Sequence, residues 1–320
     1  MTIVSSGTSL TVSSGQTVSG TTVLYGGALY VSWGGTAVAT TVDSGGYETI
    51  FTSAVDSGTT LSQGAYEIVN ASATAYNTTV LNYADLYLYG VGSGTTISSG
   101  YETVYGNGLA VSTTIHGGEQ TVYGSALDTA VLSGGEQYVL DGSASSTTIS
   151  GGGSQYIVDG SASSTTISSG GYQYAETSGT ASGSLVSSGG VQFVEQAGIA
   201  QGTTIFNGGY QYVNGSGTTI GTVISSGGVE YVYSGATANS TTVFSGGEIV
   251  VYSGATVSNL TLSGGTEVFV GTTVAHLIQT MASFAANSTR EGALFESVSG
   301  GAPRVDFSPL APDHHAFVRR

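Results

Sequence analysis

The chain has 320 residues, a formal charge of −16, no lysine, and only four basic residues, Arg290, Arg304, Arg319 and Arg320. Because phosphate binding requires clustered Lys and Arg side chains, this composition excludes a nucleic-acid partner. The absence of cysteine excludes disulfides, CxxC metal sites and thiol catalysis. No apolar run reaches the roughly 18 residues of a membrane-spanning helix, so the chain is not predicted to span a membrane.

The first residues carry the repeat pattern in a shortened form. Residues 1–7 contain neither a basic segment nor an apolar run, so no standard N-terminal signal peptide is predicted. Stacked repeats need atypical ends. Residues 1–25 are therefore interpreted as an N-terminal cap or first irregular turn.

Residues 26–274 repeat one short pattern. Gly-Gly pairs at 170, 189, 208, 227 and 246 are each followed by a segment such as Tyr-Gln-Tyr-Val or Val-Glu-Tyr-Val, and 14 copies of the unit follow one another at steps of 17 to 19 residues. A fixed period of this length indicates one supersecondary unit stacked many times.

Each copy contains two short strand-like pieces separated by Gly, Ser, Asn or Asp. One follows the glycines and the other is a Thr-Thr-Val type triplet, both rich in β-branched and aromatic residues. The unit is too short for a βαβ crossover and has no helical periodicity. The sequence therefore predicts an all-β fold, a single-stranded right-handed parallel β-helix (β-solenoid) of about 14 coils.

Two side-chain rows follow from this stacking. An aromatic residue occupies one position in six successive copies, and alternation along the strand directs it outward if the following Val or Ile points inward. This aromatic ladder either binds sugars or a protein partner at the surface, or stabilises the solenoid by stacking. Its members are Tyr138, Tyr156, Tyr174, Phe193, Tyr212 and Tyr231.

A glutamine precedes the aromatic position in six copies, which predicts a ladder of amides bonded along the solenoid axis. Glutamates recur near the same strand about once per coil, as they do on solvated faces. The glutamines are Gln120, Gln137, Gln155, Gln173, Gln192 and Gln211; the glutamates are Glu48, Glu67, Glu102, Glu119, Glu136, Glu230, Glu248 and Glu267.

The pattern changes after the repeats. Apolar residues between Val274 and Ala285 recur at helical spacing, so residues 275–286 are predicted to form an amphipathic helix, either an end cap or part of an export signal. Residues 287–320 hold all the prolines and arginines and are interpreted as a poorly ordered C-terminal tail.

No motif in the chain indicates chemistry. GxSxG, HExxH and P-loop patterns are missing, and His116 stands alone at a corner, where we expect it to face solvent. The adjacent His314 and His315 lack fixed partners and do not make a metal site. We predict no catalytic residues, no cofactor and no metal.

The repeat Gly-Gly-x-Gln-x-Val, followed by Ser-Ala-x-x-Thr-Thr-Ile and Ser-Gly-Gly, resembles the AIDA-type repeat of autotransporter adhesins over roughly residues 5–274. The resemblance implies a bacterial surface or secreted β-helix passenger that mediates adhesion, autoaggregation or biofilm formation, with Ser and Thr as glycan acceptors. It implies no catalytic residues. An autotransporter needs a signal segment before the passenger and a membrane domain after it, so the chain is interpreted as an excised passenger or as a protein using another route. The tail is similar to C-terminal segments of some type I-secreted repeat proteins.

The leading hypothesis is a non-enzymatic extracellular or cell-surface adhesin or biofilm-matrix protein. Its partners are predicted to be glycans, cell surfaces or its own copies, with export machinery contacting the C-terminal tail. One alternative is a polysaccharide-active β-helix hydrolase or lyase, because such enzymes use clustered carboxylates. Another is an ice-binding solenoid, because a Thr ladder recurs at β-helix spacing, although Ser184-Leu185-Val186 interrupts it.

Overall fold

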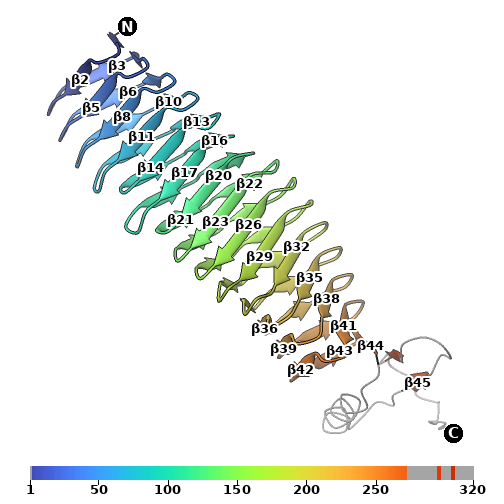
Figure 1. Ribbon diagram of the computed structural model, residues 1–320. Helices are drawn as coiled ribbons and strands as arrows, with labels where there is room; N and C mark the ends of the chain where they lie inside the picture. Colours follow the sequence, from blue (N-terminus) through green and yellow to red (C-terminus); the bar gives the residue numbers. More distant parts are fainter. Residues whose placement is uncertain (1, 272–293, 297–303, 307–320) are drawn as a thin grey trace. The chain divides into compact units, whose positions relative to one another are not determined.

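A computed structural model of the chain describes residues 2–271, 294–296 and 304–306 (Figure 1). Contacts divide the chain into two compact units, Met1–Thr166 with Gly170–Gln173 (unit 1) and Ile167–Ser169 with Tyr174–Arg320 (unit 2). Every regular element in the described residues is a strand, and none of these residues forms a helix suited to crossing a membrane. The predicted helix at 275–286 and most of the tail at 287–320 lie outside the described residues.

Each coil of unit 1 contributes one strand to each of three sheets, in the order B, C, A along the chain. Sheet A contains β1 (Thr2–Val4), β4 (Thr21–Val23), β7 (Thr41–Val42), β10 (Thr60–Leu61), β13 (Thr79–Leu81), β16 (Thr96–Ser98), β19 (Thr114–His116), β22 (Ala130–Leu132) and β25 (Thr148–Ile149). Sheet B contains β2 (Ser9–Val12), β5 (Ala28–Val31), β8 (Tyr47–Ile50), β11 (Tyr66–Val69), β14 (Asp85–Leu88), β17 (Tyr101–Val104), β20 (Glu119–Val122), β23 (Glu136–Leu140) and β26 (Ser154–Val158). Sheet C contains β3 (Thr17–Ser19), β6 (Thr36–Val38), β9 (Val55–Ser57), β12 (Thr74–Tyr76), β15 (Val91–Ser93), β18 (Leu109–Val111), β21 (Ser125–Leu127), β24 (Ser143–Ser145) and β27 (Ser161–Ser163).

Unit 2 repeats this arrangement, and two strands, β28 (Thr166–Ile167) and β29 (Tyr172–Glu176), have residues in both units. Its sheet A strands are β31 (Leu185–Val186), β34 (Thr204–Ile205), β37 (Val223–Ile224), β40 (Thr242–Phe244) and β43 (Thr261–Ser263). Its sheet B strands are β32 (Val191–Val194), β35 (Tyr210–Val213), β38 (Val229–Val232), β41 (Glu248–Tyr252) and β44 (Thr266–Val270). Its sheet C strands are β30 (Thr180–Ser182), β33 (Ile199–Gln201), β36 (Thr218–Ile220), β39 (Thr237–Asn239) and β42 (Thr256–Ser258).

Neighbouring coils pair in parallel and in register, so equivalent positions of the repeat lie directly beside one another. Figure 1 shows β2, β5, β8, β11 and β14 side by side in unit 1, and Tyr66 of β11 pairs with Tyr47 of β8. The first coil is already in this register, since Ser9 pairs with Ala28. Nine triplets of strands from β2 to β28 and five from β29 to β43 confirm the predicted parallel β-solenoid of about 14 turns. In unit 2, β46 (Arg304–Asp306) pairs antiparallel with β44 and with β45 (Leu294–Glu296).

The interior follows from strand alternation. Sheets A and B direct Val, Ile and Leu inward, as at Ile149 and Ile157, and sheet C directs small residues inward, as at Ala144; all three are buried. The sheet C strands are the feature that the sequence pattern missed. They are three residues long and rich in Ser, Thr and Ala, so the expectation of two strands per coil was wrong by one.

The paired glycines have two different roles. Gly208 has a φ of +71°, a left-handed conformation that glycine adopts without strain. Gly209 needs glycine for space, because a Cβ there would lie 2.4 Å from the carbonyl oxygen of Val186. A positive φ therefore explains the first glycine of this pair, and close backbone packing explains the second.

Candidate functional site: an outer aromatic face and a buried polar ladder

The aromatic ladder lies on the outside of sheet B. In unit 1, Gln137 and Val139 are buried, whereas Tyr138 between them is half-buried and faces outward. Its ring stacks on Tyr156 of the next coil, with ring centroids 4.8 Å apart and an interplanar angle of 11°. Desolvation and a 3.0 Å hydrogen bond to the Glu136 carboxylate raise the pKa of the Tyr138 phenol.

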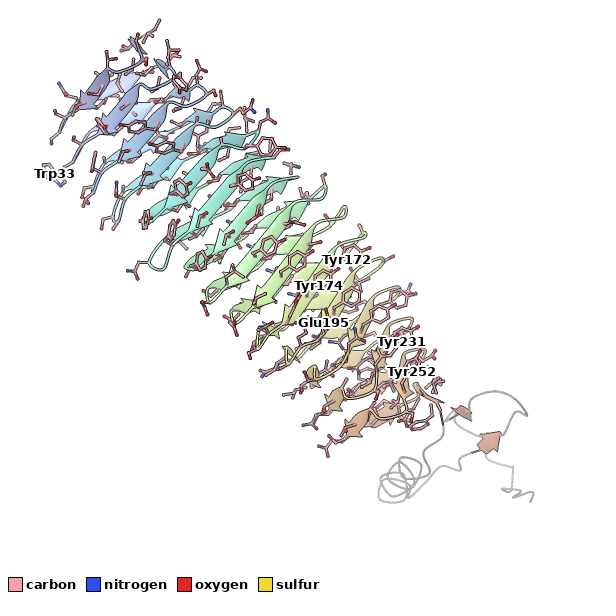
Figure 2. All side chains as sticks on the ribbon, viewed as in Figure 1. Trp33, Tyr172, Tyr174, Glu195, Tyr231 and Tyr252 are labelled. Atoms are coloured by element: carbon pink, nitrogen blue, oxygen red, sulfur yellow. The ribbon has the colours of Figure 1, made fainter. Side chains whose placement is uncertain are left out.

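Unit 2 holds a longer stack. Tyr174, Phe193, Tyr212 and Tyr231 follow one another with centroid separations of 5.0, 5.2 and 5.0 Å and interplanar angles of 7°, 17° and 6°. A second outward row adds Tyr233 and Tyr252, whose centroids are 4.5 Å apart. Figure 2 shows Tyr174, Tyr231 and Tyr252 on this side of unit 2 together with Glu195. We define the aromatic face as Tyr174, Phe193, Tyr210, Tyr212, Tyr231, Tyr233 and Tyr252.

The geometry of the stack decides what the face can offer to a partner. Parallel rings about 5 Å apart cover one another's faces, so solvent meets ring edges and phenol hydroxyls. Ring stacking therefore stabilises neighbouring coils. A partner at this surface would meet a row of hydroxyls on an apolar base.

A shorter aromatic row occupies the first coils of unit 1. The hydroxyls of Tyr30 and Tyr47 lie 2.6 Å apart, and this hydrogen bond, with burial, raises the pKa of Tyr47 to about 12. Tyr47 also stacks on Tyr66 with ring centroids 5.1 Å apart and an interplanar angle of 2°.

The predicted glutamine ladder is confirmed, and it lies inside the solenoid. In unit 1 each side-chain Nε2 donates to Oε1 of the preceding coil, from Gln137 to Gln120, from Gln155 to Gln137 and from Gln173 to Gln155, all at 2.7 Å. In unit 2 the Nε2 of Gln211 donates to Gln192 at 2.6 Å. All of these glutamines are fully buried. The ladder thus satisfies polar groups along the core axis.

A second buried row completes this polar strip. The first Thr of the Thr-Thr-Val triplets points inward and in many coils donates to the glutamine or glutamate row, as from Thr147 to Gln137 at 3.2 Å, whereas Thr21 and Thr40 are buried without a hydrogen-bond partner. The second Thr faces outward: Thr147 is 1% exposed, whereas Thr148 is exposed to solvent. Only the outward Thr row can therefore meet a ligand or a modifying enzyme.

The expectation that the recurring glutamates form a solvated face was wrong for most of them. Five share the strand position of the inward glutamines and are buried, whereas those one residue earlier, such as Glu136, face outward. The buried members are Glu48, Glu67, Glu102, Glu230 and Glu267; the outward members are Glu119, Glu136 and Glu248. The strand alternation could have predicted which glutamates are buried, because a residue two positions before an inward valine or isoleucine also points inward.

Three buried carboxyl groups meet in unit 1. Thr59 Oγ1 lies 3.2 Å from Glu48 Oε2 and 2.9 Å from Asp56 Oδ1, and Thr78 donates to Glu67 Oε2 at 3.3 Å. Glu67 pairs with Glu48 in register, and Asp56 occupies a sheet C row that Ala37 and Ala75 fill in the neighbouring coils. We call Glu48, Asp56 and Glu67 the acid cluster. Burial raises all three carboxyl pKa values, that of Asp56 to about 7.

The remaining buried glutamates stand singly. Glu102 accepts a 2.6 Å bond from Gln120 and thus ends the amide ladder, while burial raises its pKa. Glu230 accepts from Thr219 at 2.8 Å and Thr241 at 3.2 Å, and burial raises its pKa to about 7. Burial alone raises the pKa of Glu267 to about 7.

Neither a metal nor a nucleophile site emerges from the described residues. His116 is exposed, as predicted. Within residues 2–271, no group of three or more His, Asp and Glu side chains is arranged to hold a metal ion. The acid cluster is sealed in the core, since its three residues are 0% exposed.

With this geometry established, comparison with known proteins identifies the family. A family model described as "Adhesin of bacterial autotransporter system, probable stalk" (AIDA) matches residues 171–228. The crystal structure of a TibC-catalysed, hyper-glycosylated TibA fragment (residues 55–350) is 33% identical, with a TM-score of 0.69, over 82% of this chain and 92% of that one. The chain belongs to the AIDA family of autotransporter adhesins.

Two further comparisons add nothing to this assignment. The Dettilon tailspike protein matches 76% of this chain and 62% of its own at 10% identity and a TM-score of 0.21, too low to support any argument. No curated protein matches the chain.

The family match confirms the predicted resemblance to AIDA-type adhesins and covers part of the aromatic face. The segment matched by the family model, residues 171–228, contains Tyr174, Phe193 and Tyr212 of the aromatic face. Membership implies an adhesin role and a place at the cell surface or outside the cell.

Proposed function

We propose that the chain is a non-enzymatic adhesin stalk that binds glycans, cell surfaces or its own copies through the aromatic face. The observation that carries this proposal is the outward stack of Tyr174, Phe193, Tyr212 and Tyr231 on one side of unit 2. Aromatic residues are enriched at binding surfaces because they combine an apolar body with a polar tip.

The chemistry of this face favours partners rich in hydroxyl groups. Its phenols can donate and accept hydrogen bonds, and the acidic groups near it include Glu195 (Figure 2) and Glu248; burial raises the pKa of Tyr231, and the charge of Glu248 raises it further. Residues 2–271 contain no Lys or Arg, so nothing in them attracts phosphate or sulfate groups. Neutral glycans and the like-charged surface of a second copy, met through uncharged side chains, both fit this description.

Glycosylation is part of the proposal. The TibA fragment was crystallised in a hyper-glycosylated form. In this chain, the Thr residues that can accept a sugar on sheet A are the outward ones, such as Thr148 and Thr166, because the inward row is buried.

The enzymatic alternative receives little support from the site. A polysaccharide hydrolase or lyase needs carboxyl groups that its substrate can reach, but the acid cluster is fully buried. The ice-binding alternative needs an unbroken outward Thr row. On sheet A that row is interrupted by Ala130, Leu185 and Val223.

The proposal also concerns where the protein acts and how it is exported. An adhesin acts outside the cell or at its surface. Export as an autotransporter passenger and type I export through residues 275–320 remain the two routes to compare.

The proposal is tested with the purified chain on a panel of neutral glycans and on immobilised copies of itself. We expect the double variant Phe193→Ser/Tyr212→Ser to lose binding to whichever partner the wild type binds. The matched control is Phe206→Ser/Phe244→Ser, because these rings are 40% and 46% exposed in the same unit but belong to sheet A, where Phe206 follows β34 and Phe244 ends β40. Equal binding by the two variants would contradict the proposal. Hydrolysis or cleavage of a glycan would instead restore the enzymatic alternative.

A further inference from the structure

The acid cluster has fewer hydrogen-bond donors than its carboxyl oxygens need if all three carboxyls are ionised. Thr59 Oγ1 is within hydrogen-bond distance of both Glu48 Oε2 and Asp56 Oδ1 but carries one hydrogen, so it can donate to only one of them. The other contact is a hydrogen bond only if that carboxyl is protonated and donates to the hydroxyl oxygen. If both carboxyls were ionised, two lone pairs would face each other at about 3 Å.

The other carboxyl oxygens of the cluster also lack hydrogen-bond donors. Glu48 Oε1, Asp56 Oδ2 and Glu67 Oε1 are buried without a hydrogen-bond partner. Thr40 Oγ1 is a further buried oxygen without such a partner, although it lies close enough to Glu48 to lower the pKa of that carboxyl. A proton on each carboxyl would turn an orphaned acceptor into a donor for these neighbours.

No positive charge can replace those protons. The chain has no lysine, and its first arginine is Arg290. Along the same inward row of sheet B, the cluster is bounded by Leu29 and Leu86, both 0% exposed. On sheet C it is bounded by Ala37 and Ala75, and on sheet A the inward residues are Val42, Leu61 and Val80, so no other titratable group faces it.

We propose that the acid cluster holds protons in the folded state and makes residues 47–78 an acid-stabilised segment that opens as pH rises. Three buried carboxylates without a counter-charge would repel one another and lack solvation, and both costs vanish on protonation. In the coils of Gln120, Gln137 and Gln155 the same row holds amides and no titratable group. Residues 47–78 therefore carry buried titratable groups that the glutamine coils lack.

The direction of the pH effect follows from proton counting. Unfolded carboxyls release their protons above about pH 4, whereas the buried ones keep them, so the folded segment binds more protons in this range. Its stability is therefore complete at low pH and falls as pH rises toward the raised pKa values, that of Asp56 being about 7. Each carboxyl that ionises on opening shifts the opening equilibrium about tenfold per pH unit.

The test is amide hydrogen–deuterium exchange of the full chain between pH 5 and pH 8. Peptides covering residues 47–78 are compared with peptides covering residues 137–158 of the same molecule, because their ratio cancels the intrinsic pH dependence of exchange. We expect protection of 47–78 relative to 137–158 to fall at least about a hundredfold from pH 5 to pH 7, as one ionising carboxyl predicts. The variant Glu48→Gln/Asp56→Ala/Glu67→Gln should show a flat ratio.

The control variant Glu119→Gln/Glu248→Gln removes two outward glutamates of the same sheet that lie outside both compared peptides, and it should keep the wild-type profile. If the triple variant fails to fold, Asp56→Ala, which restores the Ala of that row, is compared with wild type by infrared absorption of the protonated carboxyl at pH 6. Loss of part of that band supports the proposal. A wild-type ratio that does not change with pH, a triple variant with the wild-type slope, or a wild type without a protonated band overturns it.

Discussion

Replacing Gln155 by leucine tests whether the amide ladder stabilises the solenoid. Gln155 donates to Gln137 at 2.7 Å and to Thr147 at 3.2 Å, and accepts from Gln173 at 2.7 Å and Thr165 at 3.3 Å. Leucine fits this row, as Leu86 shows, so the substitution mainly removes hydrogen bonds. It deprives the fully buried Gln173 side chain of an acceptor.

The expected cost follows from these contacts. Two short amide bonds contribute about 1 kcal/mol each, and a buried donor that loses its acceptor costs about 1–3 kcal/mol, partly offset by the added apolar burial. We expect Gln155→Leu to lower the free energy of unfolding by about 2–4 kcal/mol, measured by urea denaturation followed by circular dichroism. The same substitution at Gln201, which is exposed on sheet C, should change it by less than about 0.5 kcal/mol. A Gln155→Leu variant as stable as wild type would refute the reasoning.

Three further predictions test the glycine corners, the isolated buried glutamate Glu230 and the two Thr rows of sheet A. Gly209→Ala should lower the melting temperature more than Gly208→Asn, because a Cβ at 209 meets a backbone oxygen at 2.4 Å whereas asparagine tolerates the left-handed φ at 208; equal effects would contradict the two roles. Glu230→Gln should reduce by about 3 kcal/mol the loss of stability that wild type shows as pH rises from about 4.5 to 7, since the pKa of Glu230 is raised to about 7 in the folded state; urea midpoints of both proteins across this range give the result, and identical slopes would oppose it. Thr147→Ala should cost about 1–3 kcal/mol and Thr148→Ala less than about 0.5 kcal/mol in the same assay, because only Thr147 is buried and bonded to the ladder; a larger cost at 148 would reverse the assigned faces.

The solenoid could be predicted because its repeats hold their phase. Val139 and Ile157 recur at one position of the repeat, and the same alternation that turns them inward turns Tyr138 and Tyr156 outward. In-register stacking then aligns like residues automatically. The number of coils follows from the number of repeats.

The third strand could not be predicted from the same pattern. A strand such as Ser143–Ser145 has one inward residue, Ala144, and two small polar neighbours, which is also the composition of a turn. Its strand character comes from pairing with the coils on either side, where Ala126 and Ala162 occupy the same row. Tertiary context, not local propensity, decides its conformation.

The burial of the glutamates could have been predicted from strand alternation, but their charge favoured the interpretation that they face solvent. Glu48 stands two residues before Ile50, as Gln137 stands two before Val139, so alternation directs both inward. The usual exposure of glutamate favoured the opposite interpretation. The compensating groups could not be identified from sequence, because Asp56 and Thr59 reach Glu48 only through the closure of the coil.

The central claim is that the aromatic face makes this member of the adhesin family adhesive. The most direct measurement compares bacteria that display the full chain, its Phe193→Ser/Tyr212→Ser variant or its Phe206→Ser/Phe244→Ser variant at equal surface density, and counts adherent and aggregated cells. The account predicts that wild type and the sheet A variant adhere or aggregate equally and that the aromatic-face variant does neither. Full adhesion by the aromatic-face variant would contradict the account and leave the stacked rings with a purely structural role.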